Sequence, residues 1–108
     1  MRQIKDLEGQ AKKVWIFLET GEQRREFLAR AAEEGSRWMN GDPIKASDRA
    51  VVVGLGPERT LGQVGLFLWC QSFQCHPDIL RVHYGRYRAG EEDYLCRRPG
   101  LAGGLKLG

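Results

Sequence analysis

The sequence predicts one α+β domain, in which a single main helix packs on one face of a four- to five-stranded, mostly antiparallel sheet. An apolar run at residues 14–18 leads directly into a well-capped amphipathic helix that ends at Gly35. After it, short β-rich runs follow one another through turns that contain Gly or Pro. Strands joined by short turns pair antiparallel, and 108 residues is the usual length of one domain.

The first strand and the helix after it carry the clearest local signals. Residues 14–17 are β-branched or aromatic, which favours a central strand. Thr20 is the expected N-cap, and Gln23, three residues later, completes a capping box. Gly35 suits the left-handed position that follows a helix. The stripe expected to face the sheet consists of Phe27, Leu28, Ala31 and Ala32.

A hairpin is predicted next, around Asn40-Gly41. This dipeptide is typical of tight hairpin turns, and residues 36–39 and 44–46 flank it as the two expected arms. Pro43 limits the second arm to an edge strand or a loop, since proline has no N–H for a ladder.

Three further strands are expected in the second half of the chain. The run at residues 63–73 is the most apolar and is expected near the middle of the sheet. The last strand is expected over residues 79–84, with residue 88 as its furthest extent, before a polar turn at 89–93. The other strand is predicted at residues 50–55.

The two ends differ from the domain in composition. Residues 1–12 are polar with one turn of apolar periodicity and are expected to form a loosely ordered N-terminal arm. Residues 13–96 form the domain. Residues 97–108 are rich in glycine, basic and without periodicity, so a disordered tail is expected there.

Charge, cysteine count and hydropathy limit the possible function. The net charge of +3 resides in Arg97, Arg98 and Lys106, so residues 1–96 are neutral and a basic nucleic-acid face is not indicated. Three cysteines do not suit a secreted disulfide framework. The first residues lack the apolar core of a signal peptide, and the longest apolar run, residues 64–70, is too short to span a bilayer. We therefore expect a cytoplasmic protein without a membrane partner.

Each motif with possible chemistry also has a structural explanation. Cys70, Cys75, His76 and His83 have the pattern C-x4-C-H-x6-H, which departs from the paired short spacings of zinc sites. Neighbours such as Cys75 and His76 point to opposite sides of an extended chain, which disfavours a nucleophile–base pair. Gly54-Leu55-Gly56 precedes a turn and not a helix, so it is not a phosphate loop. The sequence predicts no catalytic residues, metal or cofactor.

The segment from Arg81 to Asp93 is the predicted binding region. Arg and Tyr are enriched at interface hot spots, which favours a protein partner. Basic residues interleaved with aromatics also suit nucleic acid, so a nucleic-acid-binding accessory protein that uses Arg81, Tyr84, Arg86, Tyr87 and Arg88 is the alternative. The predicted partner-binding residues are those expected to be exposed on the last strand and its turn: Arg81, His83, Arg86, Tyr87, Arg88, Glu91, Glu92 and Asp93.

The order of these segments resembles a family of small, mostly uncharacterised bacterial proteins carried by phages, plasmids and integrative elements. The ending R-V-H-Y-G-R-Y-R-A-G-E-E-D-Y is similar to the family's R-V-D-Y-G-K-Y-x-A-G-x-D-D-Y, with His83 in place of an acid and Arg86 in place of lysine. The resemblance covers about residues 12–95 and supplies no catalytic residues. It implies a non-enzymatic protein that binds and blocks a partner, such as an anti-CRISPR-like inhibitor of a host defence nuclease.

Overall fold

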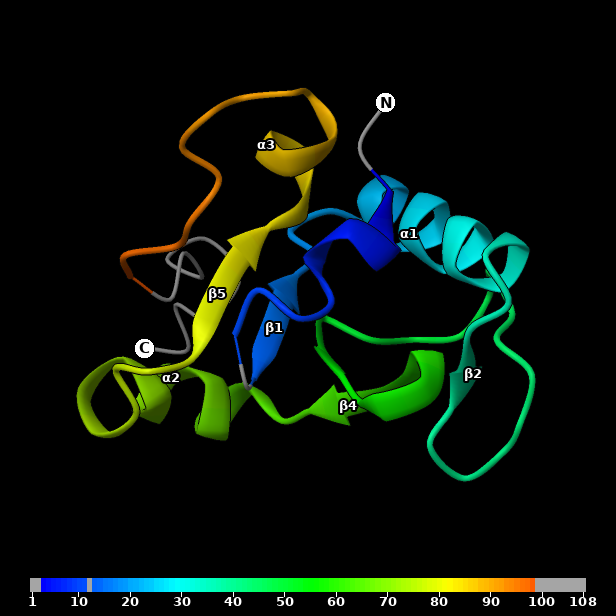
Figure 1. Ribbon diagram of the computed structural model, residues 1–108, viewed down its shortest axis with the longest axis horizontal. Helices are drawn as coiled ribbons and strands as arrows, with labels where there is room; N and C mark the ends of the chain where they lie inside the picture. The colour runs from blue at the N-terminus through cyan, green and yellow to red at the C-terminus, as the bar shows by residue number, and fades with distance from the viewer. Residues whose placement is uncertain (1–2, 12, 99–108) are drawn as a thin grey trace.

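The computed structural model describes residues 3–11 and 13–98, which form a five-stranded mixed sheet with helices on both faces (Figure 1). The predicted α+β class is confirmed, but the sheet is mixed and not mostly antiparallel. The strands are β1 (Val14–Phe17), β2 (Arg37–Trp38), β3 (Val52–Leu55), β4 (Thr60–Val64) and β5 (Leu80–His83). The helices are α1 (Gly21–Glu33), α2 (Leu66–Cys75) and α3 (Tyr84–Arg88), with short 3-10 helices η1 (Ile4–Leu7) and η2 (Pro57–Arg59).

Strand β1 lies inside the sheet, whose order is β2-β4-β3-β1-β5. It pairs antiparallel with β3 and parallel with β5, so both of its edges are hydrogen-bonded. Val14 and Ile16 point to one face, and Trp15 and Phe17 point to the other, because side chains alternate along a strand. Strand β4 pairs antiparallel with β3 and parallel with the two-residue β2.

Helix α1 begins and ends as the sequence predicts. The Thr20 hydroxyl accepts a hydrogen bond from the Gln23 N–H at 3.1 Å. The Gln23 side-chain oxygen accepts from the Glu19 N–H at 3.1 Å, one residue before the N-cap, so the reciprocal half of the box is displaced. At the other end, Gly35 has a φ of +86° and the Ser36 N–H donates to the Ala31 carbonyl, as in a Schellman motif.

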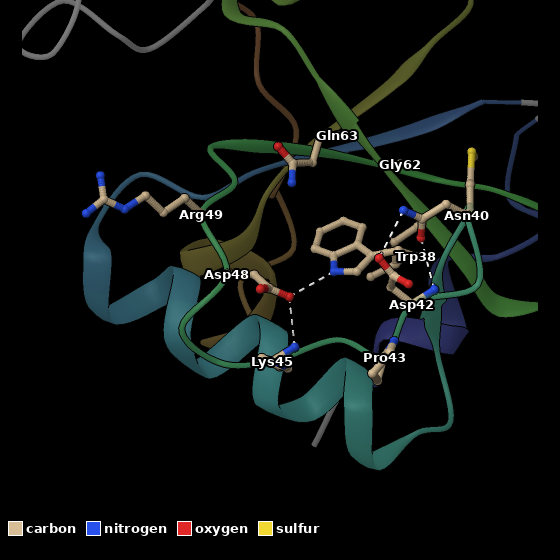
Figure 2. A pocket seen from close by; sticks show the side chains of 11 residues that line it. Trp38, Asn40, Asp42, Pro43, Lys45, Asp48, Arg49, Gly62 and Gln63 are labelled. Carbon is tan, nitrogen blue, oxygen red and sulfur yellow. Dashed lines mark hydrogen bonds between the residues drawn. The ribbon is translucent and has the colours of Figure 1, made fainter.

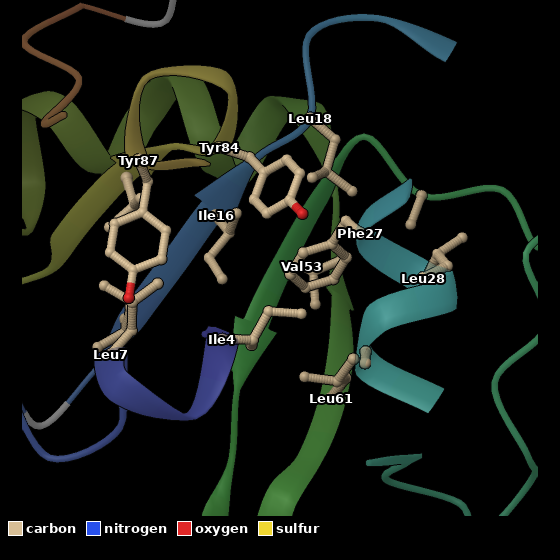
Figure 3. Close-up of a cluster of buried hydrophobic side chains, with 14 of the residues drawn as sticks. Ile4, Leu7, Ile16, Leu18, Phe27, Leu28, Val53, Leu61, Tyr84 and Tyr87 are labelled. Carbon is tan, nitrogen blue, oxygen red and sulfur yellow. The ribbon is translucent and has the colours of Figure 1, made fainter. Parts of the chain in front are cut away.

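The main hydrophobic core lies between α1 and the sheet (Figure 3). Phe27, Leu28 and Ala31 of α1 are fully buried, as the predicted stripe requires, whereas Ala32 is exposed. The Phe27 ring meets Tyr84 of α3 edge to face, with ring centroids 5.3 Å apart. The side chains that complete this core come from η1, α3, the strands and the loops between them.

Helix α2 covers part of the opposite face of the sheet (Figure 1). Its Trp69 is fully buried and stacks on Phe17 of β1, with centroids 5.7 Å apart and planes 16° from parallel. Phe73, one turn later, meets Trp69 edge to face at 5.0 Å. This smaller core holds α2 to the strands through aromatic side chains.

The predicted strand at residues 63–73 is wrong. Strand β4 ends at Val64, Gly65 is the N-cap of α2, and the rest of the apolar run is helical. Leu66, Trp69 and Phe73 pack on the sheet with a spacing of three and four residues, which is the period of a helix. A run that is apolar on nearly every side masks this period, which is why strand and helix are hard to distinguish in such a segment.

The predicted hairpin at residues 36–46 is correct only in its turn. Gly41 has a φ of +93°, and the Trp38 carbonyl accepts from its N–H at 2.8 Å. The first arm becomes β2, but β2 pairs with β4, and residues 44–46 form no strand beyond an isolated bridge between Pro43 and Arg37. Proline at the start of the second arm prevents a regular ladder there.

The N-terminal segment packs more closely than a loosely ordered arm would. Ile4 and Leu7 of η1 are buried in the main core. The Glu34 carboxylate accepts from the Ile4 and Lys5 N–H groups at 3.1 and 3.0 Å, and the Tyr87 hydroxyl donates to the Gln3 carbonyl at 2.7 Å.

The prediction of a disordered tail at residues 97–108 falls almost wholly on positions 99–108, outside the described residues. Within the described part of the chain, no helix is long and apolar enough to cross a membrane.

The N-cap of α1 gives a stability test. Thr20→Ala removes the acceptor for the Gln23 N–H and is expected to lower the free energy of unfolding by about 1 kcal/mol. Thr20→Ser keeps a hydroxyl and should retain most of the stability. Urea unfolding measures both variants, and equal losses for alanine and serine would contradict the capping role.

Candidate functional site

The predicted binding segment is not one continuous strand. The strand predicted at residues 79–84 is present as β5, which ends at His83. Its extension as far as residue 88 is wrong, because Tyr84 begins α3. His83 is the N-cap of this helix: its Nδ1 accepts from the Arg86 N–H at 3.2 Å, and its Nε2 lies 3.0 Å from Glu19 Oε1. An acid at this position would cap the helix in the same way. His83 therefore has a structural duty.

The helical turn buries the two tyrosines of the segment. Tyr84 and Tyr87 are 1% and 3% exposed, so the expectation that Tyr87 is a surface residue is wrong. Residues three apart lie on one helical face, whereas strand alternation would have separated them. Burial, followed by the nearby Glu26 carboxylate, raises the pKa of Tyr84 to about 12. Neither ring is available to stack on a base.

Arg81 holds the end of α2. Its guanidinium donates to the carbonyls of Ser72 and His76 at 3.2 and 2.8 Å and lies 4.4 Å from the Phe73 ring centroid. These carbonyls belong to the last turn and C-cap of α2, where a cation is favourable. Desolvation lowers the pKa of this guanidinium, in keeping with its partly buried place. Arg81 thus stabilises the fold.

The other predicted binding residues are exposed, and several take part in ion pairs. Arg88 pairs with Glu26, and Asp93 pairs with Arg97 at 2.8 Å. Arg86 lines a cleft of about 510 Å³ together with Arg97 and Arg98. That any of these residues binds a partner stays a prediction. The exposed members of the predicted set are Arg86, Arg88, Glu91, Glu92 and Asp93.

The cysteines and histidines do not assemble a recognisable reactive site. In the part of the chain that the structure describes, no group of three or more potential ligands could hold a metal ion. Cys75 is exposed and Cys70 is partly buried. Burial raises the pKa of the Cys96 thiol to about 11, although Arg86 and Arg81 oppose the shift, so this thiol stays protonated near neutral pH.

A cleft beside Trp38 is a feature that sequence reasoning missed (Figure 2). It has a volume of about 650 Å³ and lies between the outer edge of β4 and the loop that follows β2. Figure 2 shows the Trp38 indole between Gln63 on one side and Asp48 on the other. Clefts of this size are in the range that holds ligands. Its walls come from segments far apart in the sequence, and no local motif indicates such a cleft.

Asp48 fixes the loop wall of this cleft. One carboxylate oxygen accepts from the Trp38 indole N–H at 2.8 Å and from the Lys45 N–H at 2.9 Å. The hydrogen bond from the Lys45 backbone, then that from Trp38, lowers the pKa of this carboxyl group below its usual value of 3.8. The loop is thereby held in one conformation around the indole.

Helix α2 exposes large apolar side chains. Phe67 is 80% exposed and Leu68 is 43% exposed, whereas Trp69, the next residue, is fully buried. A helix with one face on the sheet turns the residues between its contacts outward. Had the period of this run been read as helical, positions 67 and 68 would have been recognised as its outer face.

Comparison with known proteins gives no relative. No family model matches the chain, and neither the curated proteins nor the solved structures include a match. The resemblance to mobile-element proteins therefore stays a prediction.

Asp48 gives a pH-dependent test. A carboxyl group whose pKa is lowered by folding stabilises the folded state above its unfolded pKa, and this contribution is lost as the pH falls through the lower folded value. Asp48→Asn keeps an acceptor oxygen but does not titrate. We expect the variant to melt below the wild type at about pH 7, with the difference in Tm shrinking as the pH falls below about 4.

Thermal melts of both proteins across this range measure the effect. A difference in Tm that stays constant down to about pH 2 would contradict the proposed hydrogen bonding of the Asp48 carboxylate.

Proposed function

We propose that this protein is a non-enzymatic binding module that recognises a protein partner through the outer face of α2. The observation that carries the proposal is the exposure of Phe67 and Leu68 on neighbouring positions of one helix. Large apolar side chains grouped on a surface mark interaction sites, and an aromatic ring supplies much of the energy of a contact.

The chemistry-bearing residues support a binding role over catalysis. Arg81 and His83 have structural duties at the ends of α2 and α3, and the Cys96 thiol has a raised pKa. Within the described residues, no cluster suited to a metal adds a reactive centre. In contrast to these residues, the exposed apolar side chains of α2 have no evident role in stabilising the fold, which favours a role in binding.

The finer proposal is that the partner is a host defence nuclease in the cytoplasm, such as a CRISPR effector, and that binding inhibits it. This step rests on the resemblance of residues 12–95 to proteins of mobile elements. A protein that acts by covering a partner needs surface and not a catalytic centre, which agrees with the features described above.

The α2 surface gives a direct test of partner binding. Phe67→Ser with Leu68→Ser is expected to leave the free energy of unfolding within about 0.5 kcal/mol, since exposed side chains contribute little to folding. Capture from a bacterial host lysate, with quantitative mass spectrometry, should show a partner that the wild type retains and the double variant loses by about tenfold, or roughly 1.4 kcal/mol. A captured nuclease would then be assayed for inhibition by the wild type and the double variant.

Glu33→Ser is the control, because Glu33 is an exposed side chain on a different helix, α1. It should leave capture unchanged. A partner that the α2 double variant retains as the wild type does would overturn the α2 proposal.

Nucleic-acid binding is the second candidate, favoured by the three arginines of the Arg86 cleft. However, Tyr84 and Tyr87 are buried, so the stacking that single strands require is missing from this segment. We expect no measurable binding of single-stranded DNA or RNA of about 20 nucleotides at about 150 mM salt. Fluorescence anisotropy measures this, and binding that weakens steeply with added salt would instead favour the second candidate.

A further inference from the structure

We infer that the cleft beside Trp38 binds an extended segment of a partner protein, which adds as a strand to the outer edge of β4. This site consists of residues other than Phe67 and Leu68, so the inference goes beyond the binding proposed for α2. It rests on the backbone of β4, on the walls of the cleft and on the balance of charge around it.

The outer edge of β4 loses its neighbour part-way along the strand. Strand β2 pairs with β4 only at Thr60 and Leu61. The last bond between these segments runs from the Met39 N–H to the Leu61 carbonyl, at 2.9 Å. The chain then turns away at Gly41, whose φ of +93° suits glycine. The space that a longer β2 would have filled is the cleft.

Gln63 presents an unused donor and acceptor to this space. Leu61 directs its carbonyl outward to Met39, and residues two apart on a strand direct their backbone groups to the same side. The N–H and C=O of Gln63 therefore point away from β3, and no hydrogen bond from the described residues reaches them on this side. Such an edge is a template for pairing with another chain.

The other walls of the cleft suit the side chains of an added strand. The Trp38 indole forms an apolar platform beside Gln63 (Figure 2). The loop opposite is fixed by Asp48 and anchored by Ile44 and Ala50, which are each 6% exposed. A loop that is already ordered costs little further entropy when a segment binds against it.

The charges around the cleft favour a peptide backbone over a charged ligand. Asp42 and Asp48 line it together with Lys45 and Arg49, so the lining is neutral overall. A phosphate or a nucleic acid requires an excess of positive charge. A peptide backbone is itself neutral and carries alternating donors and acceptors, which match the N–H and C=O of Gln63.

Peptide selection tests the inference with a defined probe. A phage library of random linear peptides of about 12 residues is selected on the full chain, and enriched peptides are titrated into the wild type. We expect enriched peptides to bind with a Kd below about 1 mM and to shift the NMR signals of the Gln63 amide and the Trp38 indole N–H. Failure to enrich any such peptide, or shifts confined to other surfaces, would overturn the inference.

Two variants at one position separate the backbone from the side chain. Gln63→Pro removes the outward N–H without removing a bond of the β3–β4 ladder, and proline is tolerated on edge strands. It should weaken binding of the selected peptides by about tenfold or more. Gln63→Ala keeps the N–H and should change their affinity by less than about threefold. Equal affinities for the two variants would overturn strand addition.

Asp48→Asn provides a variant that leaves β4 untouched, should Gln63→Pro fail to fold. This variant loosens the loop wall opposite Gln63, so the affinity for the selected peptides should fall. At saturating peptide concentration, the NMR signal of the Gln63 amide should still shift. Peptides should bind the Phe67→Ser, Leu68→Ser protein as they bind the wild type. Loss of binding in that protein alone would show that the selected peptides use α2 and would overturn the cleft site, whereas the proposed function would survive.

Discussion

The fold depends on burying β1 on both faces and pairing it on both edges. Ile16 and Phe17, neighbours in the chain, are buried in separate cores on opposite faces of the sheet. Burying a large apolar side chain contributes about 1.5–3 kcal/mol, so each face of this four-residue strand supports a covering helix. Helix α1 covers one face and α2 part of the other (Figure 1). Without two covered faces, a strand so apolar would expose one side to water.

Polar side chains then hold the ends of these elements together. Glu34 binds the first N–H groups of η1, Arg81 binds the last carbonyls of α2, and His83 caps α3. Each satisfies backbone groups that a helix leaves unpaired at its ends. Arg81 and His83, which suggest chemistry in the sequence, are thus committed to structure. An apolar helix face and an incomplete strand edge are the surfaces that we propose for recognition.

The predicted placement of surface residues differs from the structure where the predicted elements were wrong. Treating residues 79–88 as extended placed Tyr87 on the surface, whereas the turn of α3 buries it beside Tyr84. Treating residues 63–73 as a strand concealed Phe67 and Leu68, because a central strand has no exposed apolar face. The cleft could not be predicted, since Trp38, Asp48 and Gln63 meet only after β2 has paired with β4.

The sequence by itself determined the α+β class, the first strand and the limits of α1. Those features depend on interactions within a few residues, such as Thr20 with Gln23 and the positive φ of Gly35. Tertiary structure decided that β5 lies parallel to β1, that residues 66–75 form a helix, and that His83 and Arg81 face inward to cap other elements. An apolar run satisfies its backbone equally well as helix or strand. In the folded chain, residues 66–75 form a helix whose apolar side covers the Trp15 and Phe17 face of β1.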